Sequence, residues 1–220
     1  TASALVFLGS GGRVFWGRGG PELDNTWWRA YLAQLRRDPT QLAAELVWDL
    51  NYFCRRPTDA WYTSLFEPGR GRITGDITPC YATLSEERVA HVRVLLPHAK
   101  IIFIMRNPIE RTWSAARMVW RDSGRDINDE TRLMAYAHLE RVRLRSDYLR
   151  TLAIWEQHYP SSQIFLAFSE ELRDHPEGLL LRLYRFLGIE ASPRHIPSYA
   201  RRHVNAGTSQ QLPRRVAREM

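Results

Sequence analysis

Five consecutive apolar residues, from Ile101 to Met105, form the clearest hydrophobic pattern in the chain. An unbroken run of this kind is typical of a strand that a parallel sheet buries on both faces. Asn107 is a residue type that caps helix N-termini, and Pro108 suits the first helical position, where no N–H is needed. The pattern therefore predicts a strand that leads directly into a helix. Arg106 then lies at the carboxyl end of the strand, where open α/β sheets bind ligands.

On the predicted helix, Arg111, Ser114 and Met118 follow an i, i+3, i+7 spacing and share one face. Arg106 supplies a guanidinium that can bind an anion through two N–H groups, and Ser114 supplies a hydroxyl. Both lie near a helix start, which attracts anions. We therefore predict a phosphate site here. The alternative is that Arg106 only caps the sheet edge and Ser114 is a small packing residue.

Other short apolar segments predict further strands at 4–8, 72–76 and 163–168. Between them, apolar residues recur at helical spacing, with expected helix starts at Asp24 or Asn25, Asp38, Ser85 and Pro176 and an expected helix end at Gly188. A long helical region is expected from 131 until Pro160. Strands separated by helices predict a three-layer α/β sandwich with a mainly parallel central sheet.

The first predicted strand precedes a glycine-rich segment, Gly9-Ser10-Gly11-Gly12-Arg13. Glycines let backbone N–H groups approach a phosphate, so the segment has one feature of a phosphate-binding loop. It lacks the Gly-Lys-Ser/Thr that completes such a loop, and the residues from Arg13 to Pro21 are a poor helix start. We therefore predict a flexible loop. The same absence argues against a nucleotide kinase-like phosphotransferase.

The charge of the chain indicates an anionic partner. The 220 residues carry a formal net charge of +7, and the isoelectric point is about 9.8. The cations are spread among acidic residues and form no tract, which favours one focused pocket over a nucleic-acid-binding arm. We expect no nucleic acid partner; a basic nucleic-acid-binding protein is the alternative from another class. Lys100 is the only lysine, which we attribute to the base composition of a bacterial genome.

The two cysteines, Cys54 and Cys80, are too few for a disulfide framework and lack the spacing of metal ligands. We therefore expect reduced thiols, no metal and a cytoplasmic bacterial protein. No segment approaches the ~18 apolar residues that a membrane span needs, so we expect no membrane span. The sequence does not indicate which oligomeric state the protein adopts.

Three segments together resemble the PAPS-dependent sulfotransferases of the bacterial and glycan-modifying type. They are Arg-x-Pro-x-x-Arg-x-x-Ser at 106–114, Gly-Asp-Ile-Thr-Pro-Cys-Tyr at 75–81 and Phe-Leu-Gly at 186–188. The resemblance implies a P-loop-like sulfotransferase fold and transfer of a sulfuryl group from the donor PAPS to a hydroxyl or amine, without a metal. It also implies that Arg106 and Ser114 bind the 3′-phosphate of PAPS, and that adenosine 3′,5′-bisphosphate is the product.

By the same resemblance, Asp76 lies beside the transferred group, as the catalytic base or as an acceptor-binding residue. Thr78, Tyr81 and Arg111 are expected to bind the acceptor substrate. The alternative for Asp76 is that it caps local backbone N–H groups at a strand end. The acceptor is expected to be a small molecule, a natural product or a glycan.

The chain departs from the family pattern where the donor's 5′-phosphosulfate should bind. A loop resembling Pro-Lys-x-Gly-Thr-Thr-Ser is absent, and Arg13 stands where a Lys-Glu-x-x-Tyr-Phe-like segment has its glutamate. Thr1 and Ser3 are interpreted as remnants of that loop, with a frayed terminus as the alternative. We expect one domain, 1–220, that lacks part of this loop and the extreme C-terminus.

Near the end of the chain, Arg201 and Arg202 are expected to add cations to the 3′-phosphate site, and Asn205 a hydrogen bond. A basic surface loop without a ligand is the alternative. Because the phosphosulfate loop departs from the family pattern, a second interpretation stays open. The chain is then a catalytically degenerate member of the fold, which binds a nucleotide or a partner without turnover.

Overall fold

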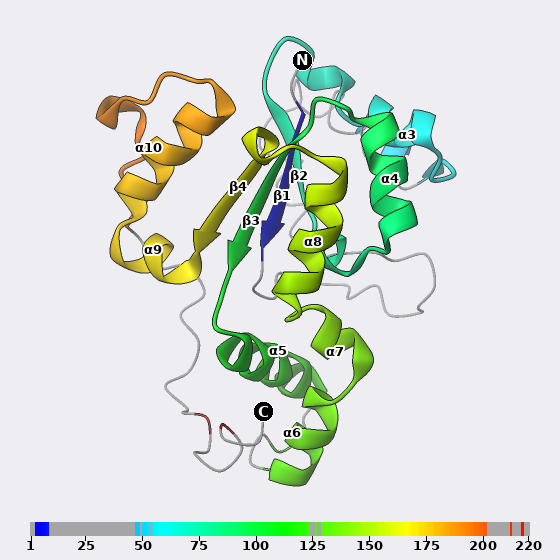
Figure 1. The fold of residues 1–220 in the computed structure, drawn as a ribbon, viewed down its shortest axis with the longest axis vertical. Helices are drawn as coiled ribbons and strands as arrows, with labels where there is room; N and C mark the ends of the chain where they lie inside the picture. The colour runs from blue at the N-terminus through cyan, green and yellow to red at the C-terminus, as the bar shows by residue number, and fades with distance from the viewer. Residues whose placement is uncertain are drawn as a thin grey trace. The chain divides into compact units, whose positions relative to one another are not determined.

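The structure, a computed structural model, describes residues 3–8, 47–48, 50–52, 54–123, 126, 129–201, 212 and 217 (Figure 1). The chain forms two compact units. One consists of Val14–Thr74 with Thr1, and the other of Ala2–Arg13 and Gly75–Met220. The prediction of one domain stays a prediction.

Four described strands form one sheet in the order β2-β1-β3-β4. They are β1 Ser3–Leu8, β2 Thr74–Ile77, β3 Lys100–Met105 and β4 Ile164–Phe168. β3 runs parallel to both β1 and β4, and Ile104 is level with Leu8 on one side and Ala167 on the other. These three strands therefore end at one edge of the sheet, which we call the carboxyl edge (Figure 1). The predicted mainly parallel sheet is confirmed.

Helices cover both faces of β3. Ile101, Phe103 and Met105 are buried in one core cluster with residues of α4 (Glu86–Leu95) and α8 (Tyr148–His158). Ile102 belongs to a second cluster, with Leu179 of α10 (Pro176–Leu187). Successive side chains of a strand point to opposite faces, so the apolar run supplies both clusters. The three-layer α/β architecture predicted from the sequence is confirmed.

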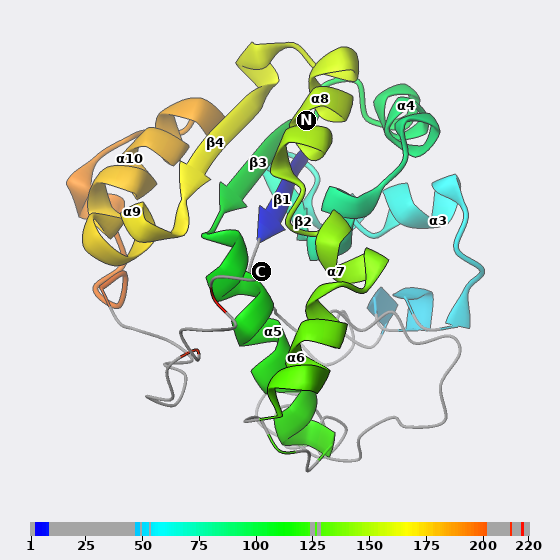
Figure 2. The same cartoon turned by 60° about the horizontal axis from the view of Figure 1, so that its bottom comes forward.

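Two helices begin at the carboxyl edge directly after a strand. α5 (Pro108–Ser123) follows β3, and α9 (Ser169–Asp174) follows β4 (Figure 2). The predicted helix start at Pro108 is confirmed. One side of α5 packs on α6 (Glu130–Ala137), where Trp113, Trp120 and Leu133 are buried together.

The helical region predicted from 131 to Pro160 is divided into three helices, α6, α7 (Glu140–Leu144) and α8. Asp129 and Asp147 cap the first and the last of these, accepting backbone N–H bonds at 3.0 Å from Arg132 and Arg150. The predicted helical region is therefore present, and these capping side chains mark where two of its helices begin. Further along the chain, Gly188 ends α10 with a left-handed φ of 78°, which confirms the helix end predicted there.

The described part of the other unit includes α3 (Asp59–Ser64) and η1 (Glu67–Gly69). Trp48 and Tyr52 stack with ring centroids 5.2 Å apart, and the Trp61 indole N–H donates to the Asn51 carbonyl at 2.8 Å. The helix starts predicted at Asp24, Asn25 and Asp38 lie outside the described residues. The described part of the unit that contains the sheet also includes three short 3-10 helices: η2 Pro79–Thr83, η3 Ser161–Gln163 and η4 Pro193–His195. No described helix combines the length and apolar character that crossing a bilayer requires.

Candidate functional site at the carboxyl edge

Arg106 is the residue that links β3 to α5. The last residue of β3, Met105, is level with Phe168 of β4, so Arg106 lies just beyond the paired part of the sheet. Its side chain is 30% exposed, and a guanidinium Nη2 lies 3.4 Å from a carboxylate oxygen of Glu110. The guanidinium is thus accessible at the carboxyl edge, as the sequence predicts, and pairs with an acidic side chain one helical turn along α5.

The N-terminus of α5 is capped from within. The Asn107 side-chain oxygen accepts the backbone N–H groups of Ile109 at 3.0 Å and Glu110 at 3.3 Å. This confirms the predicted cap, but it also occupies N–H groups that a helix start otherwise offers to an anion. The binding of an anion at this edge therefore depends more on side chains than on the backbone N–H groups of the helix start.

Ser114 lies two turns along α5 and is partly buried. Helical periodicity places it on the same face as Asn107, with a rise of about 10 Å between them. A phosphate that contacts both Arg106 and Ser114 would therefore lie along this face of the first two turns.

Arg111 is buried, with 5% of its surface exposed. Its guanidinium donates to the hydroxyl of Ser146 and to the carbonyl of Val142, both at 2.8 Å. Burial lowers its pKa, because charge is less stable away from water. The expectation that Arg111 binds the acceptor is not supported, because its N–H groups hold the α7 region against α5.

We expect Arg111→Met to lower the free energy of unfolding by about 1–2 kcal/mol, because the Val142 carbonyl and the Ser146 hydroxyl lose a buried donor. Urea denaturation measures this change. Arg143→Met is the matched control, since Arg143 is an exposed arginine of α7. Equal stability of the two variants would contradict the structural role of Arg111.

Asp76, Thr78 and Tyr81 form a hydrogen-bonded cluster around β2 and η2. The Thr78 hydroxyl donates to Asp76 Oδ1 at 2.7 Å, and the Tyr81 hydroxyl donates to Asp76 Oδ2. Thr78 is buried, whereas the other two side chains are partly exposed. The structure thus brings together three residues that the sequence predicts near the transferred group, and hydrogen bonds orient both oxygens of the carboxylate.

The start of α8 connects this cluster to Arg106. The Thr151 hydroxyl donates to the Ala82 carbonyl of η2 at 2.8 Å. One turn earlier, the Tyr148 hydroxyl donates to the Arg106 carbonyl, also at 2.8 Å. Sequence reasoning missed Tyr148 as a site residue, because its spacing fits the apolar stripe of a helix and hydroxyl contacts over 42 residues have no local signal.

Two of the residues predicted near the chain ends, Ser3 and Arg201, are described by the structure. Ala4 is level with Lys100, so Ser3 lies at the amino end of β1, opposite the carboxyl edge. The structure therefore does not place Ser3 at the carboxyl edge, and its assignment to a 5′-phosphate site stays a prediction. Arg201 donates to Glu177 of α10 at 2.8 Å, which raises the pKa of Arg201 and lowers that of Glu177. The other candidates lie outside the described residues: Thr1, Arg202 and Asn205. So does Arg13, which stands where the family pattern has a glutamate.

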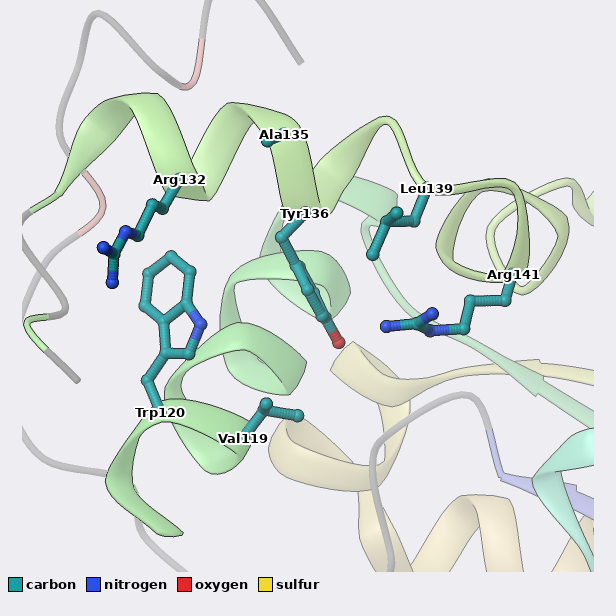
Figure 3. Close-up of a pocket in the computed structure, with 7 residues that line it drawn as sticks. All are labelled: Val119, Trp120, Arg132, Ala135, Tyr136, Leu139 and Arg141. Carbon is teal, nitrogen blue, oxygen red and sulfur yellow. The ribbon is translucent and has the colours of Figure 1, made fainter. Parts of the chain in front are cut away.

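A separate hollow of about 460 Å³ lies on the far part of α5 (Figure 3). The rings of Trp120 and Tyr136 line it, with the guanidinium groups of Arg132 and Arg141 at its two ends. Trp120 is about 18 Å along α5 from Pro108. The hollow is therefore too far from Arg106 to share a phosphate with it.

An accessible arginine at the end of a buried parallel strand, followed by a capped helix, defines an α/β protein with a candidate anion site at the carboxyl edge. The model of the sulfotransferase family matches residues 43–193, and the chain therefore belongs to the sulfotransferase family. This range contains Arg106 and Ser114 as well as the Asp76 cluster.

Curated proteins that are similar to the chain are also named as sulfotransferases. Human bifunctional heparan sulfate N-deacetylase/N-sulfotransferase 2 is 29% identical over 147 residues, which are 59% of this chain and 16% of that protein. Human heparan sulfate glucosamine 3-O-sulfotransferase 6 is 28% identical over 141 residues, 60% of this chain and 40% of that protein. The chain thus spans less than half the length of either relative.

Solved structures support the fold. A sulfotransferase from Alicyclobacillus acidocaldarius matches with a TM-score of 0.58 and 22% identity, over 74% of this chain and 65% of that chain. The sulfotransferase domain of the Synechococcus PCC 7002 olefin synthase matches with a TM-score of 0.50 and 18% identity, over 89% of this chain and 72% of that chain. The P-loop-like sulfotransferase fold predicted from the sequence is confirmed.

Proposed function

We propose that the protein transfers a sulfuryl group from PAPS to a hydroxyl or amine of a small-molecule, natural-product or glycan acceptor. The observation that carries this proposal is the position of Arg106, whose accessible guanidinium lies at the carboxyl end of β3 immediately before α5. A guanidinium suits a phosphate because it donates two parallel hydrogen bonds. Ser114 adds a hydroxyl on the first two turns of α5.

In this proposal Arg106 and Ser114 hold the 3′-phosphate and so fix the donor in place. Asp76 takes the proton of the acceptor as its oxygen or nitrogen attacks sulfur in line. The new O–S or N–S bond forms while the bond from sulfur to the bridging phosphate oxygen breaks. That oxygen keeps the electron pair and leaves on adenosine 3′,5′-bisphosphate. Thr78 and Tyr81 orient the Asp76 carboxylate through their hydrogen bonds.

The class of acceptor follows from charge and from the relatives. A net charge of +7 favours an acidic acceptor. The two relatives are named as an N-sulfotransferase and a 3-O-sulfotransferase of heparan sulfate, so an amine and a hydroxyl are both chemically suitable. A test panel therefore contains a phenol, a neutral sugar and an acidic glycan with free amino groups.

One observation favours a second candidate function, nucleotide binding without turnover. Lys100, the only lysine in the sequence, donates to the Phe186 carbonyl at the amino end of β3. It therefore lies at the edge of the sheet opposite Arg106, and these 220 residues contain no other lysine for a 5′-phosphosulfate. Leu8, the last residue of β1, lies at the carboxyl edge. Residues 9–13 come next in the chain, but they lie outside its described part.

Calorimetric titration of the 220-residue protein tests the proposed function, with adenosine 3′,5′-bisphosphate compared against 5′-AMP. Binding that requires the 3′-phosphate supports a PAPS site, whereas equal or absent binding of the two nucleotides overturns it. Incubation with PAPS and the acceptor panel then separates the two candidates. Acceptor-dependent release of adenosine 3′,5′-bisphosphate indicates sulfuryl transfer. Nucleotide binding without such release indicates a catalytically degenerate member of the fold.

We expect Glu110→Gln to strengthen the binding of adenosine 3′,5′-bisphosphate by about twofold to fivefold, because the carboxylate pairs with Arg106 and repels a phosphate. The effect should shrink as salt is raised, since both side chains are partly exposed. Titration at two salt concentrations measures it. Glu190→Gln is the control, because Glu190 forms a similar exposed pair with Arg194. Weaker binding in Glu110→Gln would contradict this prediction.

A further inference from the structure

The hydroxyl of Tyr148 makes two hydrogen bonds to the backbone of one residue. It donates to the carbonyl of Arg106 at 2.8 Å and accepts the N–H of Arg106 at 3.4 Å. Burial raises the pKa of Tyr148, so the hydroxyl keeps its proton and remains a donor. A side chain from α8 therefore bonds to both backbone groups of the residue that links β3 to α5.

These backbone groups lie where the sheet ends. The last pairs of β3 are Ile104 with Leu8 and Met105 with Phe168, so Arg106 lies beyond both ladders. α5 begins two residues later, at Pro108. A linking residue between two elements has few local constraints, and its backbone groups need partners from elsewhere. The Tyr148 hydroxyl provides them.

The ring of Tyr148 is itself held in place. It packs edge to face on Phe103 of β3, with ring centroids 5.5 Å apart and planes at 79°. The preceding residue, Asp147, caps α8 by accepting the N–H of Arg150 at 3.0 Å. The hydroxyl thus projects from a packed ring on the first turn of a capped helix, which is a rigid position from which to fix a backbone.

We propose that Tyr148 is a positioning residue that fixes the backbone of Arg106 so that its guanidinium meets the 3′-phosphate of the nucleotide. This inference rests on the proposed function, because it assigns Arg106 to that phosphate. Tyr148 and Thr151 are three residues apart and share a face of α8. Because Thr151 holds the Ala82 carbonyl of η2, the same helical turn sets the spacing between Arg106 and the segment that carries Asp76.

Tyr148→Phe tests the inference, because it keeps the ring on Phe103 and removes only the hydroxyl. We expect the affinity for adenosine 3′,5′-bisphosphate to fall by about threefold to tenfold and that for 5′-AMP to stay unchanged. The selectivity for the 3′-phosphate therefore falls, which a general loss of stability would not cause. Calorimetric titration and the ligand-induced rise in melting temperature measure it.

Tyr159→Phe is the matched control. Tyr159 follows α8, is buried, and its hydroxyl donates to the Leu96 carbonyl at 3.1 Å, remote from Arg106. We expect this variant to keep the selectivity of the wild type. Unchanged selectivity in Tyr148→Phe would overturn the inference, as would an unfolded Tyr148→Phe beside a folded control, since the hydroxyl would then serve folding. A wild type without selectivity would instead overturn the proposed function.

Discussion

Replacing Asp76 by Asn is expected to lower the rate of sulfuryl transfer by about a hundredfold to ten-thousandfold, the usual contribution of a general base. The amide has nearly the shape of the carboxylate and accepts a hydrogen bond from Thr78 or Tyr81, but it cannot take a proton from the acceptor. The affinity for adenosine 3′,5′-bisphosphate should be unchanged, because the nucleotide is assigned to Arg106 and Ser114. Release of the bisphosphate from PAPS with a reactive acceptor gives kcat and KM.

Asp129→Asn controls for the loss of one negative charge, because Asp129 caps α6 and takes no part in the Asp76 cluster. The pattern of constants separates the roles considered for Asp76. A raised KM at constant kcat would make Asp76 an acceptor-binding residue. Normal kinetics with a lowered melting temperature would leave it a structural group of the β2–η2 segment, and would contradict the proposed mechanism.

Replacing Arg106 by Ala is expected to weaken the binding of adenosine 3′,5′-bisphosphate by about tenfold to a hundredfold. The reason is the loss of a charge-assisted phosphate contact of about 1.5–3 kcal/mol. The binding of 5′-AMP should change little, because it lacks the 3′-phosphate. The fold should survive, since the Arg106 side chain is partly exposed and the bonds to Tyr148 come from its backbone. Calorimetry with both nucleotides measures the two affinities.

Arg194→Ala is the matched variant for this experiment. Arg194 pairs with Glu190 four residues away, as Arg106 pairs with Glu110, and both pairs are partly exposed. The Arg194→Ala variant therefore removes a similar ion pair and the same positive charge from another part of the protein. If Arg106→Ala folds normally and binds the bisphosphate as tightly as Arg194→Ala, the phosphate site has been assigned to the wrong residue.

The parts of the fold that could be predicted are those with local causes. The apolar run at 101–105 identifies a strand buried on both faces, and Asn107 with Pro108 identifies the helix start within one residue. Asp76, Thr78 and Tyr81 are close in sequence, so the segment that carries them could be recognised before their hydrogen bonds were known.

The rest depends on contacts between distant segments. Arg111 looks like a ligand beside Arg106, but its partners lie in and after α7, 31 and 35 residues further along. Ser3 looks like part of a loop until the pairing of Ala4 with Lys100 fixes the direction and place of β1. Tyr148 has the spacing of a core residue, and only tertiary structure shows what its hydroxyl binds.

The place of β1 inside the sheet has a consequence for synthesis of the protein. β1 precedes β2 and β3 in the chain and lies between them in the sheet, yet these neighbours begin only at Thr74 and Lys100. At about 5–20 residues per second, a ribosome needs about 3 to 13 s to cover the ~65 residues between β1 and β2. During that time an apolar strand has two unpaired edges, the condition that favours aggregation. Among the described strands of this sheet, β1 is therefore the one that gains most from a chaperone until its neighbours are translated.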